Sequence, residues 1–172
     1  MEFLISYIVG YIVALFTSLG VSGEQTNVPP INTSLLSGTT TALVVSVTDG
    51  DTIEVRIGTS SQKTKVRYIG IDTPEPYATK IPECGSNEAS THNKELVQNK
   101  TVTLVSGLDP YDDYGRVLAY VYVDDIFVNE TMVREGYANV MMFSPNTKYK
   151  TTFSNLHREA RTQQLGIWSL CE

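Results

Sequence analysis

The sequence predicts an α+β domain built on a small closed β-barrel, and two features of its pattern indicate this fold class. Short strand-like stretches dominate the first part of the domain, and helical stretches are interleaved mainly towards its end. The chain has 172 residues, of which 41% are hydrophobic and 19% charged. That length is enough for one domain with its own core and an N-terminal extension.

The five expected strands come from alternating or β-branched stretches bounded by turn residues. They lie at residues 42–48, 52–57, 65–71, 101–105 and 117–123. Asp49-Gly50 separates the first two strands and is a strong hairpin signal. A proline-containing loop is expected at residues 72–85, and a polar stretch at 109–116 separates the last two strands.

Three helices are expected between and after these strands, at residues 87–98, 129–135 and 152–164. Ser86 is expected to cap the first helix with its hydroxyl, and Gly136 suits the end of the second. Three Asn-x-Ser/Thr sequons occur, at Asn32, Asn99 and Asn129. Because Asn129 opens a helix, an N-cap or a buried hydrogen-bonding role is favoured there over glycosylation.

The N-terminal part of the chain is apolar and then polar. Residues 3–23 carry no charge, and about 20 such residues suffice to span a bilayer as a helix. A secretory signal peptide is the competing interpretation of residues 1–23, although the start lacks Lys or Arg. Residues 24–40 are rich in Thr, Ser, Asn, Gly and Pro, which predicts a flexible linker before a domain at 41–172. Either interpretation predicts that the domain is exported, and membrane contact through residues 3–23 if they are not cleaved.

The two cysteines fit an oxidising compartment. A bridge between Cys84 and Cys171 would tie the C-terminus to a mid-chain loop, and two free thiols are the alternative. Two cysteines and two histidines without close spacing do not form a zinc site.

The net charge of −6 argues against a protein that holds nucleic acid by electrostatics alone. Such domains usually carry a basic patch or stripe. A transient enzyme with a bound divalent cation needs less basic surface than a packaging protein does.

The residues that could take part in catalysis or metal binding are concentrated in four short motifs. These are Asp49-Gly50-Asp51-Thr52, Arg67, Asp72-Thr73-Pro74-Glu75 and Asp113-Tyr114-Gly115-Arg116. A hard divalent cation prefers oxygen ligands, which Asp51, Asp72 and the Thr73 carbonyl would supply. Glu75 would hold a water near the cation. Arginines suit phosphate because the guanidinium fork matches paired oxygens and stays protonated. Together these residue types favour phosphodiester cleavage.

Each motif also has a structural explanation. Asp49-Gly50-Asp51 is typical of a turn, and Asp72 to Glu75 resembles the start of a helix. Arg67 would be an ordinary solvated residue if it faced outward, whereas an inward charge in a barrel needs a partner or a ligand. Arg116 would serve equally as a turn residue.

The ordered combination resembles the staphylococcal nuclease (thermonuclease) family across residues 42–169. The resembling stretches are 47–55, 66–75, 87–97, 114–123, 128–140 and the ending Gly166-Ile167-Trp168-Ser169. The resemblance implies a five-stranded OB-fold barrel with three helices. It also implies a calcium-dependent nuclease (Ca2+ as cofactor) that cleaves DNA and RNA, prefers single strands, and leaves 3′-phosphate ends.

The resemblance further implies a role for each matched residue. Asp51 and Asp72 are the expected calcium carboxylates, Thr73 gives its carbonyl, and Asp49 is an acid near the metal that does not bind it directly. Glu75 is expected to position or deprotonate the water. Arg67 and Arg116 are expected to bind the phosphate, and Tyr114 to contact a nucleotide. A bound calcium ion would act as a Lewis acid towards the phosphate.

The sequence departs from the family pattern at two places. Asp113 stands where the family typically has lysine, which adds negative charge beside the substrate. The family's tyrosine platform is missing around residues 141–143, although Phe143 can still stack on a base and the two methionines are expected in the core. His92, His157 and Trp168 are expected to have structural roles.

Two other classes of function remain open. Domains of this fold can lose the catalytic residues and act as nucleic-acid or ligand-binding modules, and a metal-dependent ligand-binding protein on an OB barrel is a third option. All six matched catalytic and metal positions are filled here, which favours the enzyme, and a monomer is expected.

Overall fold

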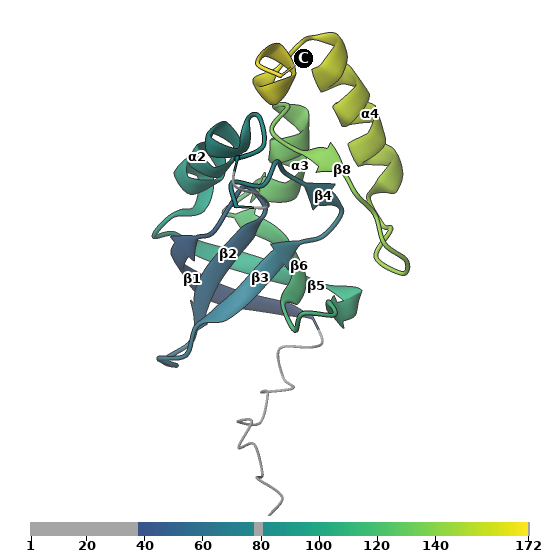
Figure 1. The fold of residues 1–172 in the computed structure, drawn as a ribbon. Coiled ribbons are helices and arrows are strands. Elements are labelled where there is room, and N and C mark those ends of the chain that lie inside the picture. The colour runs from purple at the N-terminus through teal and green to yellow at the C-terminus, as the bar shows by residue number, and fades with distance from the viewer. Residues whose placement is uncertain (1–37, 78–80, 172) are drawn as a thin grey trace, which may run out of the picture. The chain divides into compact units, whose positions relative to one another are not determined.

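The computed structural model describes residues 38–77 and 81–171, which carry a closed barrel and the helices around it (Figure 1). The barrel strands are β1 (Thr39–Val47), β2 (Thr52–Ile57), β3 (Thr64–Tyr68), β5 (Thr101–Tyr111) and β6 (Val117–Val123). They follow the order β3-β2-β1-β5-β6, and a parallel pairing of β3 with β6 closes the barrel. The predicted α+β fold with a five-stranded OB-type barrel and three helices is confirmed.

Shorter elements complete the domain. The two-residue strands β4 (Ile71–Asp72) and β8 (Asn139–Val140) pair with each other, and β7 (Ile126–Phe127) pairs with β6. The helices are α2 (Ser86–Val97), α3 (Val128–Arg134) and α4 (Lys150–Thr162), followed by the 3-10 helix η2 (Gly166–Ser169).

The core lies inside the barrel and under α3 and α4. Strand residues such as Val44 and Val55 are fully buried, as their alternation with more exposed neighbours predicts. Met132 of α3 and Phe153 of α4 are also fully buried. Burial of each large apolar side chain contributes about 1.5–3 kcal/mol, so the helices are held to the barrel mainly by this packing.

Two predicted strand ends are wrong. The strand expected at 65–71 ends at Tyr68, because Gly70 takes a left-handed conformation (φ 85°) and the chain then starts β4. A Cβ at Gly70 would lie 2.8 Å from Cε of Met142, so this turn is also tightly packed. The strand expected at 101–105 is longer than predicted, because β5 continues to Tyr111 across an irregular register after Ser106. Part of the polar stretch predicted at 109–116 is therefore strand.

The predicted cap of the first helix is also wrong. Gly85, not Ser86, is the N-cap of α2, and no side chain caps the helix. Gly85 has φ 80°, and a Cβ there would lie 2.5 Å from Cγ2 of Ile167. The close approach of η2 therefore requires glycine at the helix start, and Ser86 becomes the first, buried residue of the helix.

Asn129 has the predicted buried hydrogen-bonding role and is not an N-cap. Its Oδ1 accepts the Val121 N–H at 2.8 Å, and its Nδ2 donates to the Ile69 carbonyl at 2.9 Å. The side chain is fully buried, so the sequon at Asn129 is inaccessible in the folded domain. Asn99 is exposed, and Asn32 lies outside the described residues.

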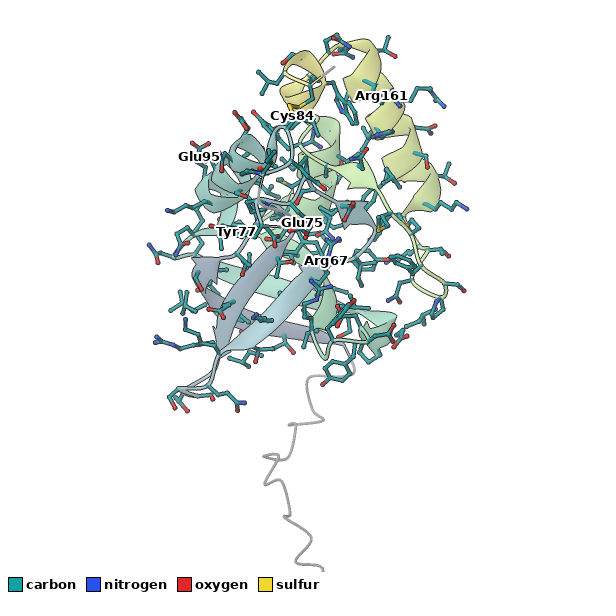
Figure 2. The ribbon with its side chains drawn as sticks, viewed as in Figure 1. Arg67, Glu75, Tyr77, Cys84, Glu95 and Arg161 are labelled. Carbon is teal, nitrogen blue, oxygen red and sulfur yellow. A yellow bond between two sulfur atoms is a disulfide. The ribbon has the colours of Figure 1, made fainter. Side chains whose placement is uncertain are left out.

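The predicted disulfide is present. Cys84, labelled in Figure 2, is bonded to Cys171 and ties the loop before α2 to the end of the chain. The predictions for residues 1–23 and for most of the linker lie outside the described residues, and β1 begins at Thr39, within the stretch expected to be linker. Among residues 38–77 and 81–171, no helix has the length and apolar character needed to cross a bilayer.

Candidate active site

The turn between β1 and β2 carries two buried carboxylates. Asp51 is fully buried, and its N–H donates to Oδ1 of Asp49 at 3.0 Å. Oδ2 of Asp51 accepts the Thr73 N–H at 2.8 Å and the Thr73 hydroxyl at 3.2 Å. A Cβ at Gly50 would lie 2.6 Å from Oγ1 of Thr73, so the glycine lets Thr73 close over the turn. The motif is therefore more than a hairpin turn.

Arg67 of β3 faces this turn and joins the two acidic motifs. Its Nη1 lies 2.5 Å from Oδ2 of Asp51, and its Nη2 lies 2.8 Å from Oδ1 of Asp72. The side chain is 13% exposed, so the outward-facing interpretation does not apply. Figure 2 shows Arg67 and Glu75 close together at the top of the barrel in this view.

An acidic cluster surrounds this arginine. Carboxylate oxygens of Asp49, Asp51 and Glu75 lie within 4.8 Å of one another. With Asp72, four carboxylates gather around Arg67, and oxygen donors with excess negative charge fit a hard divalent cation such as calcium. Asp49 contributes an oxygen to this cluster, and its expected role as an acid beside the metal stays a prediction. The individual ligand roles of Asp51, Asp72 and Thr73 stay predictions.

Burial tunes the protonation of these acids. It raises the pKa of Asp51 to about 7, against the opposing charge of Arg67. Burial also raises the pKa of Glu75, with a further contribution from the negative charge of Asp49. The backbone of Glu75 is held by Glu83, whose Oε2 accepts the Glu75 N–H at 2.9 Å. A carboxyl group with a raised pKa in a fixed position suits general-base chemistry.

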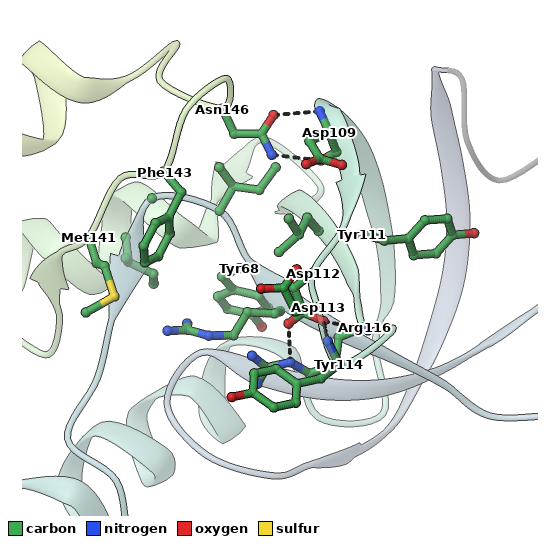
Figure 3. A pocket seen from close by; sticks show the side chains of 15 residues that line it. Tyr68, Asp109, Tyr111, Asp112, Asp113, Tyr114, Arg116, Met141, Phe143 and Asn146 are labelled. Carbon is green, nitrogen blue, oxygen red and sulfur yellow. Dashed lines mark hydrogen bonds and ion pairs between the residues drawn. The ribbon is translucent and has the colours of Figure 1, made fainter.

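A cavity of about 410 Å³ adjoins the cluster and contains both arginines (Figure 3). Four residues predicted from the sequence line it, namely Arg67, Tyr114, Arg116 and Phe143. Tyr114 and Phe143 are 86% and 72% exposed, as expected for rim residues that could stack on a ligand. Met141 also lines the cavity and is exposed, so its predicted core position is wrong, whereas Met142 packs against the core.

Asp112 is a cavity residue that the sequence reasoning missed. Its Oδ2 lies 2.5 Å from Nε of Arg116, and its Oδ1 accepts the N–H groups of Arg116 and Tyr114 at 2.8 and 3.0 Å. Although burial opposes it, these hydrogen bonds hold the pKa of Asp112 below its ordinary value. Asp112 thus fixes the orientation of Arg116, and its position four residues before the arginine, across a glycine turn, was the available signal.

Two buried asparagines also position the site without any sequence signal. Asn146 donates from Nδ2 to the Asp109 carbonyl at 2.7 Å and accepts the Asp109 N–H at 3.0 Å, which fastens the loop of Phe143 to β5. Asn93 of α2 donates to the Asp49 carbonyl at 2.9 Å and accepts the Tyr68 hydroxyl at 2.9 Å. Helix α2 is thereby attached to the acidic turn.

The histidines and the tryptophan lie away from the acidic cluster and make packing contacts. His92 stacks on Tyr137 with ring centroids 4.1 Å apart and pairs with Glu135. His157 packs edge-on against Trp168. Their expected structural roles agree with these contacts.

The reported relatives of this chain whose names state a function are nucleases. The family model described as staphylococcal nuclease homologue matches residues 65–170. A thermonuclease of Staphylococcus intermedius is 39% identical over 127 residues, which cover 73% of this chain and 74% of that protein. Endonuclease YncB of Bacillus subtilis (strain 168) is 44% identical over 127 residues, covering 70% of this chain and 58% of that protein. An uncharacterized protein of Bacillus anthracis is 39% identical over 130 residues, so the chain spans only 60% of its length.

Proposed function

Because the chain belongs to the staphylococcal nuclease family, we propose that it is a calcium-dependent endonuclease that hydrolyses phosphodiester bonds of DNA and RNA and leaves 3′-phosphate ends. One observation carries the proposal. Arg67 lies within 2.8 Å of both Asp51 and Asp72, beside Glu75 and at the edge of a cavity that also contains Arg116. Acids for a cation and arginines for a phosphate are therefore adjacent.

The chain's own groups divide the reaction between them. The guanidinium groups of Arg67 and Arg116 bind the scissile phosphate and stabilise the negative charge that grows as phosphorus becomes five-coordinate. Glu75 orients the attacking water and accepts its proton, a contribution of about 10²- to 10⁴-fold. The bond between phosphorus and the 5′ oxygen breaks, and that oxygen takes a proton from solvent and leaves as a hydroxyl. Asp51 and Asp72, with the Thr73 carbonyl and Asp49 alongside, would hold calcium, which supplies Lewis-acid stabilisation of the phosphate when bound. Tyr114 and Phe143 contact the nucleotide at the rim.

Digestion of single-stranded DNA at low salt tests the proposal. We expect the purified chain to digest it with calcium present and to stop when a chelator is added. Arg67→Ala and Glu75→Ala should each lower kcat by about 10²-fold or more, because each removes a group that acts on the reacting atoms. Glu75→Gln keeps the shape of the side chain and separates loss of the base from loss of packing. Mapping of product ends tests the 3′-phosphate assignment.

Matched variants control for charge and folding. Arg56 of β2 and Glu95 of α2 are exposed and lie outside the cluster and the cavity, so Arg56→Ala and Glu95→Ala should cleave like the wild type. Circular dichroism checks that every variant folds. A folded wild type that binds single-stranded DNA but never cleaves it with calcium present would contradict the enzyme and favour the alternative, a catalytically weak binding module.

We also propose that the domain works outside the cytoplasm as a monomer. The Cys84–Cys171 bridge supports this location, since disulfides persist mainly in oxidising compartments. The apolar residues 3–23 support it too, either as a membrane anchor or as a cleaved signal peptide. Labelling of intact cells with an antibody to the domain, compared with lysed cells, would test it.

A further inference from the structure

The rim of the cavity is acidic and repels a polynucleotide, although the arginines inside the cavity suit its phosphates. Asp109, Asp112 and Asp113 line the cavity, and Asp112 is neutralised by Arg116. The whole chain carries a charge of −6, so a polyanion approaching the cavity meets net repulsion. A local concentration of positive charge elsewhere on the surface would supply attraction over a longer range.

Such a concentration exists at the C-terminal end of the domain. From Gly136 to Cys171 the chain has four basic residues and a single acid, Glu159, although acids outnumber bases over the whole sequence. We call Lys148, Lys150, Arg158 and Arg161 the basic stripe. All four are exposed. Among the described residues, none of the four forms an ion pair with a carboxylate, whereas Lys63, Arg67, Arg116 and Arg134 do.

Helix geometry aligns these charges. At 3.6 residues per turn, Lys150, Arg158 and Arg161 fall within an arc of about 80° on α4, and Glu159 lies outside that arc. Two ends of the stripe are steadied by aromatic rings, since Nζ of Lys148 lies 4.9 Å from the Tyr149 ring and the Arg161 guanidinium lies 5.0 Å from the Trp168 ring. Such contacts leave the positive charge available to solvent.

The stripe starts where the cavity wall ends. The loop that contributes Met141, Phe143 and Asn146 to the cavity leads directly into Lys148 and α4. Figure 1 shows α4 running away from this loop, and Figure 2 shows Arg161 at the far end of the helix. From Lys150 to Arg161 the helix rises about 16 Å, a length that spans several phosphates of an extended strand.

We propose that the basic stripe binds the backbone phosphates of a single polynucleotide strand where that strand leaves the cavity. The inference rests on the proposed nuclease function and extends it, since it makes long strands better substrates than short ones. Phe143 holds the strand at the rim, and the stripe supplies the attraction that the acidic rim lacks. Binding of this kind contacts phosphates only, so it carries no base preference.

A charge-matched pair of variants of the full chain tests the stripe. The stripe variant is Lys148→Ala, Lys150→Ala and Arg158→Ala, which leaves Arg161 on Trp168 undisturbed. The control variant is Arg56→Ala, Lys65→Ala and Lys94→Ala, which removes three exposed charges elsewhere. Both have the same net charge, so any difference between them reports position. The substrates are a thirty-nucleotide single-stranded DNA and a thymidine trinucleotide, the latter too short to follow α4.

The stripe variant should raise KM for the long strand about ten-fold at low salt and lower the slope of log KM against log salt by about 2, since each phosphate contact contributes about 0.7 for single strands. Its kinetics on the trinucleotide should match those of the wild type, and the control variant should keep a wild-type slope. Equal changes in the two variants, or an equal loss on the trinucleotide, would overturn the proposal.

Binding of the long strand, measured by fluorescence anisotropy in the presence of chelator, separates the two proposals. Suppose that the wild type never cleaves, and that the stripe variant binds the strand more weakly than the wild type while the control variant does not. The nuclease proposal then fails and the stripe proposal stands. If both variants bind with the affinity and salt slope of the wild type, the stripe proposal fails whatever the cleavage assay shows.

Discussion

Asp51 is the residue at which burial and charge conflict most directly. A fully buried carboxylate is costly unless its oxygens have partners, and here Arg67 and Thr73 provide them. Burial nevertheless raises the pKa of Asp51 to about 7, and it raises that of Glu75 as well. At Asp51, a proton therefore competes with a cation near neutral pH.

This competition predicts a pH-dependent effect of calcium on stability. A raised pKa means that the folded domain holds the Asp51 proton more tightly than the unfolded chain does. Without metal, the contribution of this group to stability therefore falls as the pH rises from the ordinary carboxyl range towards 7. Calcium requires the deprotonated acids, so it should raise Tm more at pH 8 than at pH 5.

Thermal melts with calcium or chelator at the two pH values measure this effect. Asp51→Asn should abolish the calcium-dependent shift of Tm, and Glu95→Gln, on the exposed side of α2, should preserve it. Calcium shifts of equal size at both pH values would show that these acids are not the binding groups.

At the scale of elements, the acidic turn depends on a helix that contributes no acid to it. Helix α2 reaches the turn through Asn93, whose amide joins the Asp49 carbonyl to the Tyr68 hydroxyl. The β4–β8 pair acts similarly from the other side, because it sets Asp72 opposite Asn139, just before the loop of Phe143. Short pairings and single buried side chains thus position the site.

Asn93→Ala should destabilise the domain by about 2–4 kcal/mol, because it leaves two buried polar groups without a partner. It should also weaken calcium binding, since the Asp49 turn loses its attachment to α2. Urea unfolding with and without calcium measures both effects. The exposed Asn87 of the same helix offers the control, because Asn87→Ala should change unfolding by less than about 0.5 kcal/mol.

For the whole molecule, the disulfide and the barrel closure connect distant parts of the chain. Cys84 and Cys171 are 87 residues apart in the sequence, so their bridge closes a long loop in the unfolded chain. The bridge holds η2 against the start of α2, where Ile167 packs on Gly85. The barrel itself is closed by β3 and β6 without help from the bridge.

Replacement of both cysteines by serine should lower the free energy of unfolding by about 4–5 kcal/mol, the loop-entropy value for a loop of this length. Urea unfolding of the wild type, with and without a thiol reductant, provides the comparison, and the reductant should have no effect on the serine variant. Unchanged stability of the reduced wild type would mean that packing of η2 on Gly85 alone holds the C-terminus.

Several elements and residues of the site were predictable because their signals are local. The Asp49-Gly50 turn, the strand alternation and Gly136 at the end of α3 each have a signal in neighbouring residues. Asp51, Arg67, Asp72 and Glu75 could be selected because their residue types suit a cation and a phosphate and because their order resembles the staphylococcal nuclease family. Asn93 and Asn146 could not be selected in this way, because their hydrogen-bond partners lie in distant segments of the chain and are known only once the domain has folded.

The sequence by itself determined the barrel class, because strand and helix periodicity encode it, and it determined which two cysteines are available for a bridge. The acids and arginines expected at the site came from ordered short motifs and from the resemblance to the staphylococcal nuclease family. Only the tertiary structure decided their geometry. The parallel pairing of β3 with β6 sets Arg67 opposite Leu118 and so brings Arg116 to the same cavity, although 49 positions separate the arginines along the chain. Strand pairing between distant segments depends on the packing of the whole barrel, and no local pattern specifies it.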